Sequence, residues 1–70
     1  MRRADMVVVL NGKEIETEAR TLDELVAEQV QAGQKIATAL NGHFVPAAAR
    51  RDSQLKPGDR VEIVSPRQGG

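Results

Sequence analysis

The chain contains no cysteine, tryptophan or tyrosine, one phenylalanine and one histidine. Without cysteine there is no disulfide to stabilise the fold, and no thiolate to bind zinc or to attack a substrate. Any sulfur or thioester chemistry in which the protein takes part therefore needs a thiol from another molecule. The single histidine, His43, has no second histidine or cysteine with which to share a metal ion, and this argues against a metal site.

The charge is balanced, with ten Lys and Arg residues against ten Asp and Glu residues. Proteins that bind nucleic acids usually show a basic face with stacking aromatic rings, so this class is disfavoured. No apolar run approaches the roughly 20 residues that span a membrane, and the basic start M-R-R-A-D precedes no signal-type apolar stretch. We therefore expect a cytoplasmic protein that binds neither nucleic acid nor membrane.

The length of 70 residues predicts one small domain. We expect this domain over residues 6–64, with a disordered leader at 1–5 and a flexible tail at 65–70. The short β-branched run M-V-V-V-L at 6–10 predicts a strand that is covered on both faces. N-G at 11–12 then predicts a type I′ hairpin turn, because both central positions of that turn need positive φ.

The segment K-E-I-E-T-E at 13–18 has a single apolar residue and several charges, which is typical of an edge strand. T-L-D-E at 21–24 has the form of a capping box and predicts the start of a helix. Gly33 is a natural stop, so the helix is expected to run for about three turns. Its apolar stripe, at helical spacing, comprises Leu22, Leu25, Val26 and Val30.

A second N-G at 41–42 separates two short apolar segments, 36–40 and 43–45, and predicts a second hairpin. Residues 47–54 show no clear period and predict a loop with a short helical turn. L-K-P-G-D at 55–59 is typical of a turn.

The last strand, R-V-E-I-V at 60–64, alternates well, with Val61 and Ile63 on one face and Glu62 and Val64 on the other. The predicted order is strand, strand, helix, strand, strand, strand. One helix must cover one face of a mixed sheet, and the first and last strands should pair at its centre because they are the most apolar. This is an α+β, ubiquitin-like β-grasp arrangement.

The segment S-P-R-Q-G-G at 65–70 follows that central strand. Gly69 and Gly70 have no Cβ, so their backbone fits a slot too narrow for other residues. The carboxylate of Gly70 is then a reactive group that the tail delivers to a partner. ATP activates a carboxylate as an acyl-adenylate, and the cations for this step must come from another enzyme. The alternative is a frayed end without function.

Several segments of the chain together resemble the ThiS family, the sulfur carriers of thiamine biosynthesis. The resemblance covers Met6 to Gly70. Where the family often has an arginine after V-P, this chain has Ala47, and Arg50 and Arg51 come later. The matching segments are V-V-L-N-G-K at 8–13, T-L-D-E-L at 21–25, A-L-N-G-H-F-V-P at 39–46, L-K-P-G-D-R-V-E-I-V at 55–64 and Q-G-G at 68–70.

This resemblance implies that Gly70 is adenylated by a ubiquitin-activating-like (E1-like) adenylyltransferase and converted to a thiocarboxylate. The sulfur would come from a persulfide donor such as a cysteine desulfurase, and would pass to thiazole synthase. Arg67, Gln68 and Gly69 would thread the channel of the partner enzyme. The chain would be a protein cosubstrate rather than an enzyme, without a bound cofactor, and the partner would consume the ATP.

Other functions fit the same pattern. The chain could be the small subunit of molybdopterin synthase, a carrier for tRNA thiolation or cysteine synthesis, or a ubiquitin-like protein modifier. It could also be an interaction module with an idle tail. A stand-alone enzyme is disfavoured, because the sequence shows no nucleophile–base pair, metal cluster or phosphate loop.

Two apolar residues are candidates for a docking patch, Phe44 and Val64; for Phe44 the alternative is packing in the core or sheet. His43 is expected to be a surface turn residue, and Arg50 and Arg51 to lie in a solvated loop. Asp59 is expected to bond to the local backbone of its turn.

Overall fold

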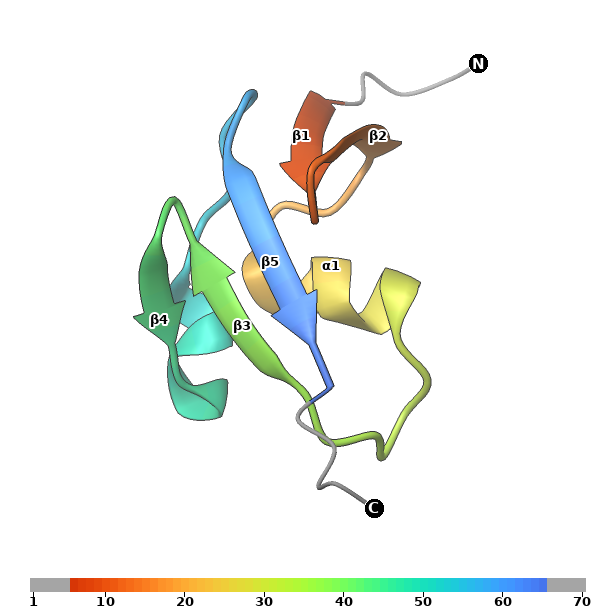
Figure 1. Cartoon of the computed structure of the whole chain (residues 1–70), viewed down its shortest axis with the longest axis vertical. Helices are drawn as coiled ribbons and strands as arrows, with labels where there is room; N and C mark the ends of the chain where they lie inside the picture. The colour runs from red at the N-terminus through yellow and green to blue at the C-terminus, as the bar shows by residue number, and fades with distance from the viewer. Residues whose placement is uncertain (1–5, 66–70) are drawn as a thin grey trace.

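The structure, a computed structural model, describes residues 6–65 of the chain. Its five strands form one sheet in the order β2-β1-β5-β3-β4, and one α-helix covers one face of this sheet (Figure 1). The α+β, ubiquitin-like β-grasp fold is therefore confirmed. The elements are β1 (Met6–Leu10), β2 (Lys13–Thr17), α1 (Leu22–Gln29), β3 (Ala37–Leu40), β4 (His43–Val45), the 3-10 helix η1 (Ala47–Asp52) and β5 (Arg60–Val64).

Strand β5 occupies the centre of the sheet. It pairs in parallel with β1, where Leu10 lies opposite Val61, and antiparallel with β3, where Ala37 lies opposite Val64. The prediction that the first and last strands form the central pair is confirmed. β2 lies at one edge of the sheet, as its charges predicted, and β4 lies at the other.

Both hairpins have the predicted turn. The φ angles are 51° at Asn11 and 84° at Gly12, and 51° at Asn41 and 85° at Gly42. Positive φ at both central positions is the mark of a type I′ turn, and its twist matches that of the flanking strands.

The core lies between α1 and the sheet. Leu22 and Leu25 of α1 are fully buried, and so is Val8 of β1. Burial of these side chains is what keeps so short a helix folded, because an isolated helix of this length is unstable in water. Among residues 6–65, the buried apolar residues are Val8, Ala19, Leu22, Leu25, Val45, Leu55 and Val61.

The helix is shorter than predicted. It ends at Gln29, and the next residue, Val30, has extended backbone. Gly33 is the positive-φ residue of a separate turn, which the N–H of Gln34 closes by donating to the carbonyl of Gln31 (3.2 Å). The apolar stripe has no member after Val30, so a further helical turn would bury nothing.

The start of the helix follows the capping-box prediction in part. The hydroxyl of Thr21 accepts the N–H of Glu24 (3.2 Å). The Glu24 carboxylate accepts the N–H of Arg20 (2.7 Å), one residue before the cap, instead of the N–H of the cap itself. The side chains of Thr21 and Glu24 therefore each accept one main-chain N–H at the start of α1.

The prediction that the first strand is covered on both faces is wrong. Val7 is 41% exposed, whereas Val8 is fully buried. A single helix covers a single face of the sheet, so alternate residues of the central strands stay open on the other face. Within residues 6–65 no helix is long and apolar enough to cross a membrane.

Replacing Leu25 by alanine tests the core. The side chain is fully buried, so the substitution should lower the free energy of unfolding by about 2–5 kcal/mol. A core of this size supplies only about 3–5 kcal/mol in total. Much of the variant should therefore be unfolded at 25 °C before any urea is added, and a urea titration measures this fraction. The control Val7→Ala should cost about 1 kcal/mol or less; equal losses would contradict this assignment of the core.

Candidate functional site

The face of the sheet opposite α1, called the outer face below, carries both residues of the predicted docking patch. Val61 and Ile63 of β5 point toward the core, so the alternating residues Glu62 and Val64 lie on the outer face. The register then places Ala39 beside Glu62, Ala37 beside Val64 and Phe44 beside Ala39. We call this set the outer patch: Ala37, Ala39, Phe44, Glu62 and Val64.

The outer patch is an exposed apolar surface. Phe44 is 69% exposed and Val64 is 55% exposed, so Phe44 is not a core residue. The two side chains lie on the strands that flank β3, two strand spacings apart, or about 10 Å. The small side chains of Ala37 and Ala39 lie between them on β3. Exposed apolar groups in this arrangement are typical of a protein-binding surface.

The other charged residues of the outer face are mostly acidic. Glu62 lies within the outer patch, and the register of β1 and β2 places Glu14 and Glu16 on the same face, beside Val9 and Val7. Arg60 is the one cation among the outer-face residues of these described strands. A partner that covers the outer face should therefore bring apolar side chains together with arginine or lysine.

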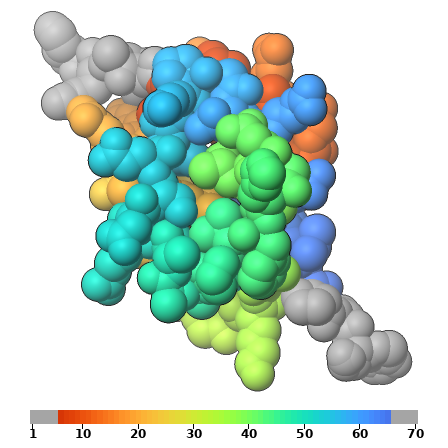
Figure 2. Space-filling view, turned by 90° about the vertical axis from the view of Figure 1, so that its left-hand side faces the viewer, coloured from red at the N-terminus to blue at the C-terminus, as the bar shows by residue number. Residues whose placement is uncertain are grey.

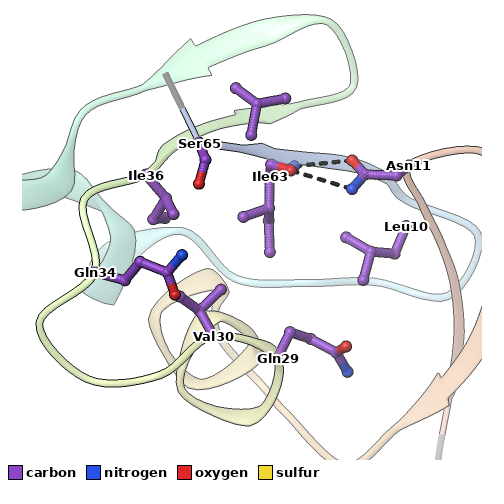
Figure 3. A pocket seen from close by; sticks show the side chains of 9 residues that line it. Leu10, Asn11, Gln29, Val30, Gln34, Ile36, Ile63 and Ser65 are labelled. Carbon is purple, nitrogen blue, oxygen red and sulfur yellow. Dashed lines mark hydrogen bonds between the residues drawn. The ribbon is translucent and has the colours of Figure 1, made fainter. Parts of the chain in front are cut away.

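A cavity of about 260 Å³ lies beside the end of β5 (Figure 3). Leu10 and Ile63 line it from the sheet, Val30 and Ile36 line it from the connection between α1 and β3, and Ser65 lies at its rim. The amide groups of Asn11, Gln29 and Gln34 supply its polar lining. Ser65, the first residue of the predicted tail segment, thus borders a partly polar hollow.

The side chain of Asn11 holds the end of β5. The N–H of Ile63 donates to Oδ1 of Asn11 (2.9 Å), and Nδ2 of Asn11 donates to the carbonyl oxygen of Ile63 (3.1 Å). Both bonds are drawn in Figure 3. The main-chain N–H of Asn11 also donates to the carbonyl of Val61 (2.8 Å).

The side chain of Asn41 holds the other end of the same strand. Its Oδ1 accepts the N–H of Arg60 (2.9 Å), and its Nδ2 donates to the carboxylate of Asp59 (3.1 Å). The sequence predicted both asparagines as turn residues but not these bonds. An N-G pair predicts a turn from local φ preferences, whereas the bonds depend on which strand lies beside the turn.

Arg50 is half-buried and hydrogen-bonded to the β3 segment rather than solvated in a loop, which corrects the prediction for this residue. Its Nε donates to the hydroxyl of Thr38 (3.0 Å) and its Nη2 donates to the carbonyl of Ile36 (3.0 Å). This follows because η1 returns the chain alongside the β3–β4 hairpin, and Figure 2 shows these segments adjacent on one side of the molecule. Arg51 is exposed, as predicted, and so is Ala47 at the start of η1.

Two minor predictions are confirmed. Asp59 accepts the main-chain N–H of Lys56 (2.8 Å), so it does bond to its own turn. His43 is exposed next to the second hairpin turn. No group of three or more His, Cys, Asp or Glu residues that could hold a metal ion occurs in the described part of the chain.

The predicted tail residues Arg67, Gln68, Gly69 and Gly70 lie outside the described residues, as do residues 1–5. What the structure does place is their starting point. β5 ends at Val64, and Ser65 follows it directly at the rim of the cavity.

Comparison with known proteins identifies a family and a similar solved structure. A family model described as the ThiS family matches residues 5–70. The crystal structure of the thiamine biosynthesis protein ThiS from Geobacter metallireducens is similar, with a TM-score of 0.76 and 29% sequence identity over 93% of this chain and 100% of that chain. No curated protein matches this chain.

Replacing Phe44 by serine separates docking from folding. Because Phe44 is 69% exposed and pairs across the strands only with Ala39, the substitution should lower the free energy of unfolding by about 1 kcal/mol or less. Urea denaturation measures this quantity. A loss as large as that expected for Leu25→Ala would mean that Phe44 supports the core.

Proposed function

The chain belongs to the ThiS family, and on this basis we propose that it is a sulfur carrier of thiamine biosynthesis. The observation that supports the proposal most directly is the position of β5. This strand is central in the sheet and leads into S-P-R-Q-G-G, a segment that the family match includes. In this proposal the partner enzymes bind the folded domain, and Gly70 at the far end of the segment carries the sulfur.

The first chemical step is activation of a carboxylate. An oxygen of the Gly70 carboxylate attacks the α-phosphorus of ATP, the bond to pyrophosphate breaks, and an acyl-adenylate forms. The triphosphate carries a high negative charge, so magnesium and cationic side chains must stabilise the transition state. The described residues contain no candidate metal cluster. We therefore assign the catalysis, and the consumption of ATP, to an E1-like adenylyltransferase partner.

The second step replaces AMP by sulfur. A sulfur nucleophile attacks the carbonyl carbon of Gly70, the new C–S bond forms, and AMP leaves with the C–O bond. Hydrosulfide gives the thiocarboxylate directly. A persulfide donor, such as that of a cysteine desulfurase, gives an acyl disulfide, whose S–S bond a second thiol then reduces. This chain has no cysteine, so each thiol in these steps belongs to another molecule.

The last step delivers the sulfur to thiazole synthase. The chain is consumed and regenerated in this cycle as a protein cosubstrate, and it is not itself the catalyst. The active sites of both partners must be deep enough to protect the adenylate and the thiocarboxylate from water. A segment ending in two glycines suits such a site, because it presents backbone without side chains.

The outer patch is the proposed docking surface for these partners. It lies on the face of the sheet that α1 leaves open, and one of its members, Val64, is the last residue of β5. A partner that covers Phe44 and Val64 therefore meets the start of the tail at the edge of its own interface. Partner residues opposite Glu62 should be cationic.

Shortening or crowding the tail should stop sulfur loading without unfolding the domain. Deleting Gly70 removes the carbonyl that accepts sulfur, and Gly69→Val adds a β-branched side chain where the channel should fit only backbone. Both variants should unfold at the wild-type urea concentration, yet show no pyrophosphate release with the partner adenylyltransferase. The control Ala48→Val introduces the same side chain at an exposed position of η1. Wild-type activity of Gly69→Val would disprove threading.

Phe44→Ser should weaken docking. Loss of a central aromatic residue from an interface typically costs at least about 2 kcal/mol, so the Kd for the adenylyltransferase should rise about thirtyfold. Titration calorimetry with a form lacking Gly69 and Gly70 would measure docking without turnover. An exposed residue outside the outer patch, Ala48→Ser, serves as the control. An unchanged Kd for Phe44→Ser would place the interface elsewhere.

A further inference from the structure

Asn11 continues the pairing of β5 beyond the end of β1. The backbone of β1 accompanies β5 only as far as Leu10, which lies opposite Val61. The chain then turns away at Asn11 and Gly12 into the first hairpin. Ile63, the next residue of β5 that faces this edge, has no main-chain partner on β1. The side-chain amide of Asn11 replaces that partner: it accepts the N–H of Ile63 and donates to its carbonyl oxygen.

The amide group of Asn11 is not needed for the turn itself. The turn requires a residue that accepts a φ of 51°, and glycine accepts this at no steric cost. The two bonds to Ile63 are therefore a separate feature of the residue. Beside them lies the cavity lined by Ile63 and Ser65, so no other element of the described structure replaces Asn11 on this edge of the strand.

We propose that Asn11 is a positioning residue for the reaction of the tail. By holding Ile63 on the β1 edge, while β3 pairs with the strand as far as Val64 on the other edge, it fixes the direction in which the chain leaves the sheet, and hence where the carboxylate of Gly70 is presented. This inference rests on the proposed function.

The length of the tail explains why this direction matters. The five residues after Ser65 span at most about 17 Å when extended. Without the Asn11 bonds, β3 alone would hold the last two residues of β5, Ile63 and Val64, and a strand end that is bonded along one edge opens more often. A strand end that opens varies in direction, so the carboxylate that it presents is in the reactive position for a smaller fraction of the time. Release of Ile63 should therefore slow the chemical step while leaving the docking surface intact.

The chain offers a matched control in Asn41. It has the same turn type, the same φ of 51° and a side-chain oxygen that accepts a β5 main-chain N–H. Its bonds lie at Arg60 and Asp59, at the start of β5 and away from the tail. Asn11→Gly and Asn41→Gly should therefore destabilise the domain similarly and differ only in their effect on the exit of the chain.

The experiment measures pyrophosphate release by the partner adenylyltransferase at saturating ATP. The carrier protein is the varied substrate, so kcat and KM refer to it. Asn11→Gly should lower kcat about three- to tenfold, the equivalent of one hydrogen bond, with KM changed less than about twofold. Asn11→Asp keeps the acceptor for the N–H of Ile63 but loses the donor, so its kcat should be intermediate. Asn41→Gly should stay within about twofold of wild type in both constants.

A second measurement tests the bonds without any partner. Amide hydrogen exchange at Ile63 should be faster in Asn11→Gly than in wild type and in Asn41→Gly, because an unpaired N–H exchanges from a locally open state. Equal exchange in all three proteins would disprove the role of Asn11 in holding the strand, whatever the protein does.

The kinetic outcomes separate the two proposals. Equal kcat for Asn11→Gly and Asn41→Gly, or a change confined to KM, would overturn the positioning role while leaving the carrier function standing. A wild-type protein that an otherwise active adenylyltransferase does not use would contradict the proposed function, and the positioning role with it.

Discussion

Strand β5 is hydrogen-bonded along both edges, and everything that the proposed function needs starts from that placement. β1 lies on one side of it and β3 on the other, and the turn residues Asn11 and Asn41 bind its two ends through their side chains. A strand held in this way is among the last parts of a small domain to open. It is a firm base from which a short segment can be presented to a partner in a defined direction.

The single helix decides which face of the sheet is open to the proposed partner. α1 covers one face of the sheet and buries Leu22 and Leu25 against it, so the other face must stay open. Phe44 and Val64 lie on that open face, and Val64 also ends the strand that leads to the tail. In the proposed function, docking and delivery are therefore joined by one strand.

Much of the fold could be predicted because its signals are local. The N-G pairs at 11–12 and 41–42 identified both turns, and apolar content identified β1 and β5 as the central pair. The exposed position of Phe44 and Val64 on one face also follows from alternation. The end of α1, the bonds of Arg50 and the side-chain bonds of Asn11 could not be predicted, because each depends on which segment the fold brings alongside. The tail proposal came from chemistry and family resemblance, and the structure places its starting point.

The central claim is that Gly70 carries sulfur, and an intact mass tests it most directly. The protein would be incubated with ATP, magnesium, a sulfide source and the partner adenylyltransferase, and the product then fragmented in the mass spectrometer. The account predicts a mass gain equal to the replacement of one oxygen by sulfur, localised to Gly70. An unchanged mass, under conditions in which the adenylyltransferase is active on another carrier, would contradict it.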